Sequence, residues 1–206
     1  MLKIYVGRHG QDEDNARKIL NGRRNAPLTE VGRNQARELA EGIKTAGFKF
    51  DAVYSSPLRR SMATAEEVCT ALGPPLHFTV LSELIERDFG VMTGRSVDKI
   101  ESCCTPDIIK TDTITYFLSP SGAETFPVLF ARAQRALGKI KAKHTDGSVL
   151  VITHGDLGKM LFAAYYGWDW KEVLTTFHFG NCELFLLSED ADPTVPHVVK
   201  VTQYNH

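Results

Sequence analysis

Two short apolar runs, each followed by a histidine and a glycine, constrain the fold of this chain most. Residues 2–7 (Leu-Lys-Ile-Tyr-Val-Gly) lead into Arg8-His9-Gly10, and residues 149–153 (Val-Leu-Val-Ile-Thr) lead into His154-Gly155. We interpret both runs as buried strands of an open α/β sheet, in which ligands bind at the carboxyl ends of the strands. If the two strands are neighbours, the histidines meet there, and the arginine makes the pocket suited to an anion such as phosphate.

Composition excludes several classes of protein. The 206 residues suffice for one good hydrophobic core, and 24 Lys and Arg against 25 Asp and Glu favour neither nucleic acid nor an acidic membrane as a partner. No run approaches the roughly 18 apolar residues of a membrane span, and the first residues predict a strand rather than an export signal. We expect a cytoplasmic protein whose cysteines stay reduced, since they show no Cys-x-x-Cys spacing: Cys69, Cys103, Cys104 and Cys182.

Hydrophobic periodicity predicts helices that alternate with strands over a single domain, residues 1–206. Strands are predicted at residues 2–7, 51–55, 76–81, 149–153, 183–187 and 197–202. Helices are predicted at residues 14–20, from the N-cap Thr29 to Gly47, from 58 to 72 before Gly73-Pro74-Pro75, from near Glu124 with Pro127 in the first turn, and from 157 to 165 before Gly167. This order predicts a three-layer α/β/α sandwich with a mostly parallel central sheet. Residues 90–121 show only weak patterns, and we expect them to form a cap insertion.

A series of short motifs follows along nearly the whole chain. They are Arg8-His9-Gly10, Asn15, Asn21-Gly22, Pro27-Leu28-Thr29 with Gly32, Ser55-Ser56-Pro57-Leu58-Arg59-Arg60, Leu84-Ile85-Glu86-Arg87-Asp88-Phe89-Gly90, Ser121-Gly122-Ala123-Glu124-Thr125 with Arg132, and Thr153-His154-Gly155. In this order they resemble the histidine phosphatase superfamily, also called the phosphoglycerate mutase-like family. The resemblance implies a phosphoglycerate mutase-like fold. The chain departs from the family pattern at Gln11, Asn25 and Thr93, which affects the expected substrate preference more than the chemistry.

The resemblance also implies the roles of the site residues. His9 would be the nucleophile, its other ring nitrogen held by a backbone carbonyl, and Glu86 would be the general acid and base. The phosphate ligands would be Arg8, Asn15, Arg60 and His154. These types suit phosphoryl transfer, which needs a nucleophile in line with the leaving oxygen and fixed positive charge around the phosphate. Imidazole is substantially neutral at cell pH, and arginine binds two oxygens at once.

Several residues keep alternative interpretations. Arg59 or Arg60 could be a solvated surface charge, and helical spacing favours Arg60 inward. Glu83 is the fallback acid should Glu86 be solvated, whereas Glu124 and Arg132 are expected to form a structural capping and ion-pair arrangement. Substrate-binding residues are expected around the entrance to the site; they are Asn15, Asn21, Gly22, Arg23 and Gly155, and Arg24 lies beside them.

The sequence therefore predicts a metal-independent phosphomonoesterase that acts through a phosphohistidine. We expect no metal and no cofactor, because no carboxylate cluster resembles a Mg²⁺ site. One alternative is a cofactor-dependent phosphoglycerate mutase-type phosphotransferase, and another is a non-catalytic regulator that binds a phosphorylated ligand. The expected partner is a small phosphorylated metabolite, with a phosphoprotein as second choice and neither nucleic acid nor membrane. The oligomeric state is left open, with a dimer as one option.

Overall fold

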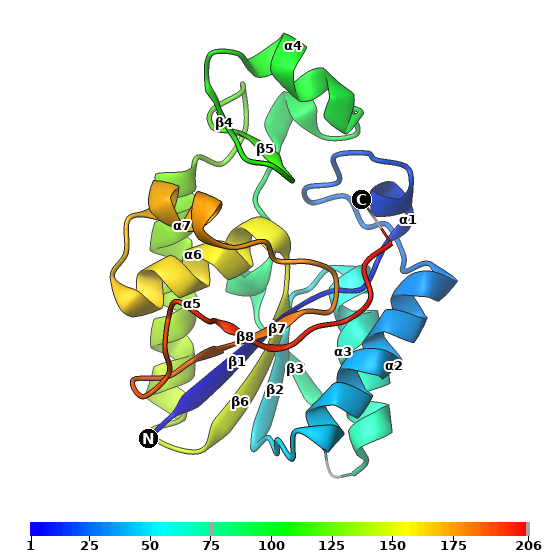
Figure 1. Ribbon diagram of the computed structural model, residues 1–206, viewed down its shortest axis with the longest axis vertical. Helices are drawn as coiled ribbons and strands as arrows, with labels where there is room; N and C mark the ends of the chain where they lie inside the picture. The colour runs from blue at the N-terminus through cyan, green and yellow to red at the C-terminus, as the bar shows by residue number, and fades with distance from the viewer. Residues whose placement is uncertain (75, 205–206) are drawn as a thin grey trace.

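Figure 1 shows the computed structural model, which describes residues 1–74 and 76–204; Pro75 lies outside the described residues. Among these residues a six-stranded sheet has the order β3-β2-β6-β1-β7-β8. The strands are β1 (Lys3–Arg8), β2 (Ala52–Ser55), β3 (Phe78–Val80), β6 (Ser148–Thr153), β7 (Leu184–Leu187) and β8 (His197–Val199). Strands β1, β2, β3 and β6 are parallel, whereas β7 and β8 add an antiparallel edge. The predicted α/β fold with a mostly parallel sheet is confirmed.

The neighbouring positions of β1 and β6 decide where the site lies. Their parallel register places Arg8 opposite Thr153, so the residues that follow, His9 and His154, leave the sheet side by side. The prediction that these two strands are neighbours is confirmed.

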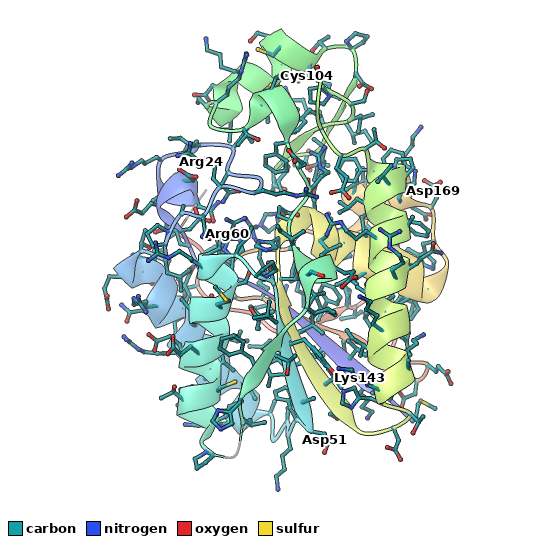
Figure 2. All side chains as sticks on the ribbon, turned by 180° about the vertical axis from the view of Figure 1, so that it is seen from behind. Arg24, Asp51, Arg60, Cys104, Lys143 and Asp169 are labelled. Carbon is teal, nitrogen blue, oxygen red and sulfur yellow. The ribbon has the colours of Figure 1, made fainter. Side chains whose placement is uncertain are left out.

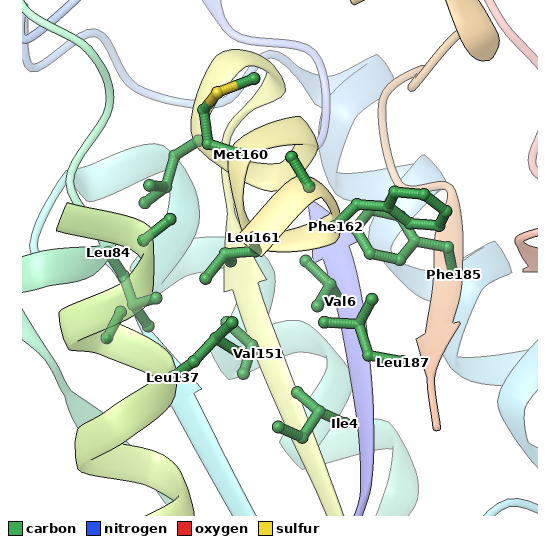
Figure 3. Packing of buried hydrophobic residues seen from close by; sticks show 14 of the residues in the cluster. Ile4, Val6, Leu84, Leu137, Val151, Met160, Leu161, Phe162, Phe185 and Leu187 are labelled. Atoms are coloured by element: carbon green, nitrogen blue, oxygen red, sulfur yellow. The ribbon is translucent and has the colours of Figure 1, made fainter. Parts of the chain in front are cut away.

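Helices cover both faces of the sheet and produce three layers (Figure 1). On one face lie α2 (Glu30–Thr45) and α3 (Arg59–Leu72), and on the other lie α5 (Phe126–Lys143), α6 (Gly155–Tyr166) and α7 (Trp170–Thr176). Alternate residues of β1 serve the two layers: Ile4 and Val6 pack under α5 and α6, and Tyr5 packs under α2. Figure 3 shows the hydrophobic cluster that contains Ile4 and Val6. Each buried aliphatic side chain in it contributes about 1.5–3 kcal/mol to the stability of the fold.

Local signals placed several helix ends correctly. Thr29 Oγ1 accepts a hydrogen bond from the Gly32 amide at 3.0 Å and caps α2. Pro127 occupies the first turn of α5, and Gly167 ends α6 with a φ of 69°. Such a left-handed conformation suits glycine.

Several other predicted boundaries of helices and strands differ from the structure. The helix predicted at residues 14–20 shrinks to α1 (Glu13–Ala16), because Lys18 adopts a φ of 54° that turns the chain. Helix α5 begins at Phe126 rather than near Glu124. The strands expected at 76–81 and 197–202 are shorter because β3 and β8 are edge strands with one neighbour each. Helix α7 was not predicted.

Residues 90–121, called the cap segment below, lie beyond the carboxyl ends of the parallel strands (Figure 1). The segment contains the 3-10 turns η2 (Gly90–Met92) and η3 (Val97–Lys99), helix α4 (Ile100–Cys104), and the hairpin of β4 (Ile108–Lys110) and β5 (Thr115–Phe117). A further turn, η1 (Ser82–Leu84), precedes it. The segment packs against Leu20 and Phe89, which lie outside it, and forms a small hydrophobic core with them. Its own residues in this core are Met92, Ile100, Cys104 and Phe117.

None of the helices formed by residues 1–74 and 76–204 is both long and apolar enough to cross a membrane.

Candidate active site

His9 stands beside His154, with 5.1 Å between the ring centroids. Its Nδ1 lies 2.7 Å from the carbonyl oxygen of Gly10, and its Nε2 accepts a hydrogen bond from Arg60 Nε at 3.1 Å. The carbonyl partner assigns the ring proton to Nδ1, which leaves the lone pair on Nε2. The nitrogen that a nucleophile needs is therefore the one that faces Arg60.

The surroundings of His9 keep the imidazole neutral. Burial lowers its pKa well below the ordinary value, and the positive charges of Arg60 and Arg8 lower the pKa further. A neutral ring retains its lone pair at neutral pH, which is the protonation state that a histidine nucleophile needs.

Arg60 is fully buried at the start of α3, at the end of the core that faces the cap segment (Figure 2). Its Nη1 donates to the carbonyl of Arg24 at 2.7 Å, and its Nη2 donates to the carbonyl of Gly22 at 2.8 Å. These two backbone acceptors hold the guanidinium against His9. Arg59 is exposed, so the helical spacing distinguished the two arginines correctly.

Asp12 is a buried carboxylate that the sequence analysis did not single out. Its Oδ2 lies 3.3 Å from Arg60 Nε and 3.9 Å from His9 Nδ1, and it accepts a hydrogen bond from Asn21 Nδ2 at 2.7 Å. Burial raises the pKa of Asp12, and the charge of Arg60 opposes that rise. Asp12 thus links Asn21 to the guanidinium of Arg60, which lies against His9.

Arg8 and Asn15 are held by the loop between α7 and β7. Arg8 Nη1 donates to the carbonyl of Phe179 at 2.7 Å. Asn181 Nδ2 donates to the carbonyl of His9 at 2.9 Å and also contacts Asn15 Oδ1 at 3.4 Å. Phe179 and Asn181 were not foreseen, because nothing in the short loop at residues 177–183 signals that it returns to the end of β1.

His154 is fully buried, and its Nε2 lies 2.7 Å from Ser56 Oγ and 3.3 Å from Ser61 Oγ. Burial and nearby arginines lower the pKa of His154 well below its ordinary value, which favours the neutral ring. Gly155 begins α6 with no side chain, and a Cβ there would stand 3.7 Å from Arg8 Cζ. This is an ordinary van der Waals distance, so the start of α6 at Gly155 lies directly beside the Arg8 guanidinium.

Glu86 is buried at the first turn of α6, where its carboxylate accepts backbone hydrogen bonds. The donors are the amides of Arg87 at 2.8 Å, Leu157 at 3.2 Å and Asp156 at 3.3 Å. Burial raises the pKa of Glu86, the charge of Asp156 adds to the rise, and the backbone donors oppose it. A carboxyl group with a raised pKa suits proton donation near neutral pH.

Arg132 fastens the loop that contains Glu86 to α5. It donates to the carbonyls of Glu83 at 2.8 Å, Ile85 and Glu86 at 3.2 Å, and its Nη2 pairs with Glu124 at 2.6 Å. The ion pair expected between Glu124 and Arg132 is present, but α5 begins at the N-cap Thr125 without a side-chain capping hydrogen bond; Arg132 in addition fixes the backbone of Glu86.

Arg23 and Glu83 are engaged with protein partners. Arg23 Nε donates to the carbonyl of Glu86 at 3.2 Å, and its Nη2 pairs with Glu124 at 3.1 Å. The structure thus places Arg23 against the loop of Glu86, where sequence analysis expected a substrate contact. Glu83 forms an ion pair with Lys139, which makes Glu86 the better placed acid.

Arg87 is a further buried arginine that no sequence pattern revealed. It forms an ion pair with Asp156 at 2.7 Å, and its guanidinium lies 4.4 Å from the ring centres of Phe117 and Phe126. Aromatic faces stabilise such a cation. Arg87 therefore links the loop of Glu86, the cap segment and the start of α6.

The assembled site is built to receive an anion. Arg8 Nε and His154 Nδ1 are buried without a hydrogen-bond partner among residues 1–74 and 76–204. Buried polar atoms without a partner are rare, and a bound ion, ligand or ordered water commonly completes them. Within the same part of the chain, no three His, Cys, Asp or Glu side chains are placed to hold a metal ion.

Comparison with known proteins identifies the family of the chain. Residues 4–202 match the family model for the histidine phosphatase superfamily (branch 1). A 2,3-bisphosphoglycerate-dependent phosphoglycerate mutase from Brucella melitensis is 29% identical over 174 residues, which is 83% of this chain and 84% of that protein.

Solved structures show the same fold. A mycobacterial glucosyl-3-phosphoglycerate phosphatase superimposes with a TM-score of 0.74 at 23% identity, over 89% of this chain and 88% of that one. A phosphoserine phosphatase from Entamoeba histolytica, solved with 3-phosphoglyceric acid, gives a TM-score of 0.71 at 21% identity over 90% of each chain. Since the family model spans nearly all of the sequence, the chain belongs to the histidine phosphatase superfamily, branch 1, as its motifs predicted.

Proposed function

We propose that the chain is a metal-independent phosphomonoesterase that acts through a phosphohistidine on His9. The observation that carries this proposal is the state of His9 itself: a buried neutral imidazole whose Nδ1 is tied to the Gly10 carbonyl, with Nε2 directed at Arg60. A residue that only bound phosphate would gain from being charged. A neutral, oriented ring instead suits nucleophilic attack.

In the first step, His9 Nε2 attacks the phosphorus and the bond to the leaving oxygen breaks. Arg8, Asn15, Arg60 and His154 hold the phosphate oxygens, and Glu86 gives its proton to the leaving oxygen. In the second step, water attacks the phosphohistidine, the P–N bond breaks, and Glu86 takes a proton from the water. Asn21, Gly22, Arg23 and Gly155 support this machinery through the contacts with Asp12, Arg60, Glu86 and Arg8 described above.

The charge of the cap segment favours transfer of the phosphoryl group to water over its transfer to a second hydroxyl. A mutase must grip a second phosphate, yet residues 91–121 contain only Arg95, Lys99 and Lys110 as cations, against Asp98, Glu101, Asp107 and Asp112. Lys110 is already paired with Glu101 at 2.6 Å. We therefore infer that a small phosphorylated metabolite with one phosphate is the substrate.

The mutase remains the second candidate because a curated relative is a phosphoglycerate mutase. The test incubates EDTA-treated protein with 3-phosphoglycerate and a 2,3-bisphosphoglycerate primer, and measures both isomerisation and free phosphate. We expect phosphate release, undiminished by EDTA, to exceed isomerisation. Isomerisation much faster than phosphate release would establish the mutase, and complete loss of activity with EDTA would overturn metal independence.

A regulator that only binds a phosphorylated ligand would need the arginines but neither His9 nor Glu86. Saturable binding of phosphate esters with no turnover of any of them would support that third function.

A further inference from the structure

A cavity of about 890 Å³ lies between the cap segment and the core, and Arg8 and Asn15 form part of its lining. The cap segment, α1 and the C-terminal end of the chain meet around it (Figure 1). Small-molecule sites have volumes of about 300–1,000 Å³. A phosphoryl group at Arg8 would occupy a small part of this space, so the cavity has room for a leaving group larger than a three-carbon acid.

The cavity has a substantial aliphatic lining. The apolar side chains come from the turn after α1 and from the cap segment; they are Ile19, Leu20, Val97, Ile100 and Ile114. A wall of this kind favours methylene or ring surface, by about 0.8 kcal/mol for each CH₂ group that leaves water. The leaving alcohol should therefore have an apolar body.

Charges in the cavity beyond Arg8 are mainly negative. The carboxylates are Asp98, Glu101 and Asp112; the cation among the other lining residues is Lys18, and His178 also contributes to the lining. Glu101 is neutralised by its ion pair with Lys110. Asp98 and Asp112 form no ion pair with any residue in 1–74 or 76–204, so a second anion on the substrate would meet two carboxylates and one lysine.

We propose, on the basis of the proposed phosphatase function, that the preferred substrates are phosphomonoesters whose alcohol joins an apolar body to a protonated amine. The phosphate end binds at Arg8 and Asn15, the apolar body lies along the aliphatic lining, and the amine approaches Asp98 and Asp112. The same carboxylates discriminate against substrates with a second phosphate or a carboxylate at that end.

A matched series of hexyl phosphates tests this proposal. The far end of the chain is a methyl, an ammonium, a carboxylate or a second phosphate, and kcat/KM is measured from phosphate release. We expect the amine to exceed the carboxylate by about tenfold at low salt, with the bisphosphate lowest. The ratio should shrink as ionic strength rises, and hexyl phosphate should exceed methyl phosphate.

Variants assign the preference to the cap segment. The double variant Asp98→Asn/Asp112→Asn should reduce the amine-to-carboxylate ratio by about threefold or more. The control is Asp146→Asn, an exposed carboxylate in the turn before β6, at the opposite end of the sheet, which should leave the ratio unchanged.

Hydrolysis of p-nitrophenyl phosphate distinguishes failure of the substrate inference from failure of the proposed phosphatase function. If this general substrate is hydrolysed but the carboxylate or bisphosphate is preferred, or the double variant keeps the wild-type ratio, the substrate inference is wrong and the phosphatase stands. If neither p-nitrophenyl phosphate nor any ester of the series is hydrolysed, the proposed function fails and the substrate inference fails with it.

Discussion

At the scale of single residues, the environment of Glu86 decides how it can serve both steps. In the proposed mechanism its carboxyl group protonates the leaving oxygen in the first step, and this matters most for alcohols that leave poorly. We expect Glu86→Gln to slow hydrolysis of hexyl phosphate by about 10²–10⁴-fold. Formation of phosphoenzyme from p-nitrophenyl phosphate, whose phenolate leaves unaided, should suffer less. Rapid-quench measurement of that step with both substrates is the check, and equal losses would refute the acid role.

The pH dependence of phosphorylation follows from opposite shifts in the pKa values of His9 and Glu86. Burial lowers the pKa of His9 below 6.5 and raises that of Glu86 above 4.5. The active form needs neutral His9 and protonated Glu86. Phosphorylation by an alkyl phosphate should therefore fall as the pH drops through the pKa of His9, and fall again as the pH rises through that of Glu86. Single-turnover rates should lose this alkaline decline in Glu86→Gln, and a decline that persists in the variant would assign it to another group.

Arg60 and Arg59 offer a matched pair on one helix. Arg60 is fully buried against His9, whereas Arg59 is exposed. Arg60→Ala should reduce kcat/KM by roughly 10²–10³-fold, the usual loss when a charge-stabilising donor is removed. Arg59→Ala should leave kcat/KM near that of the wild type. The reverse order would mean that Arg59 is the phosphate ligand.

Sequence could predict the inward arginine because helical periodicity is local. It could not predict Asp12, whose contact with Arg60 Nε depends on the loop path after β1 and on the start of α3. Asn181 was missed for the same reason, since it reaches His9 from the other end of the chain.

At the scale of elements, α5 supports the catalytic loop through Arg132. Arg132→Met leaves the loop carbonyls without their donor and leaves Glu124 paired with the more exposed Arg23; unsatisfied buried acceptors cost about 1–3 kcal/mol. We expect urea unfolding to show a destabilisation of that size, and hexyl phosphate turnover to fall more than p-nitrophenyl phosphate turnover because Glu86 is displaced. Arg135→Met, an exposed position on the same helix, is the control. Equal stability of the two variants would contradict the account.

The regular elements were predictable because β1, β6, α2 and α3 have long apolar patterns with clear end signals. Helix α7 and the hairpin of β4 and β5 are too short to show a period. The cap segment also packs its core against Leu20 and Phe89, so its structure depends on residues far from it in the sequence.

At the scale of the whole molecule, the fold brings distant segments to one edge of the sheet. Residues near the start, middle and end of the chain, Arg8, Glu86 and Asn181, meet there because β1 and β6 are adjacent and β7 returns beside β1. The ordered motifs predicted that Arg8 and Glu86 belong to one site, whereas the contribution of Asn181 was not predicted. The volume and charge of the cavity beneath the cap segment could not be predicted, since they arise only when the segment folds over the core.

The central claim is that phosphate passes through His9 without a metal. The most direct measurement quenches EDTA-treated protein during turnover of a radiolabelled phosphate ester and maps the protein-bound label. We predict phosphate that is labile to acid and stable to base on His9, formed and lost at rates that account for turnover, and absent from His9→Ala, which should also lack activity. Full turnover with no label on His9, or a His9→Ala variant as active as the wild type, would contradict the account.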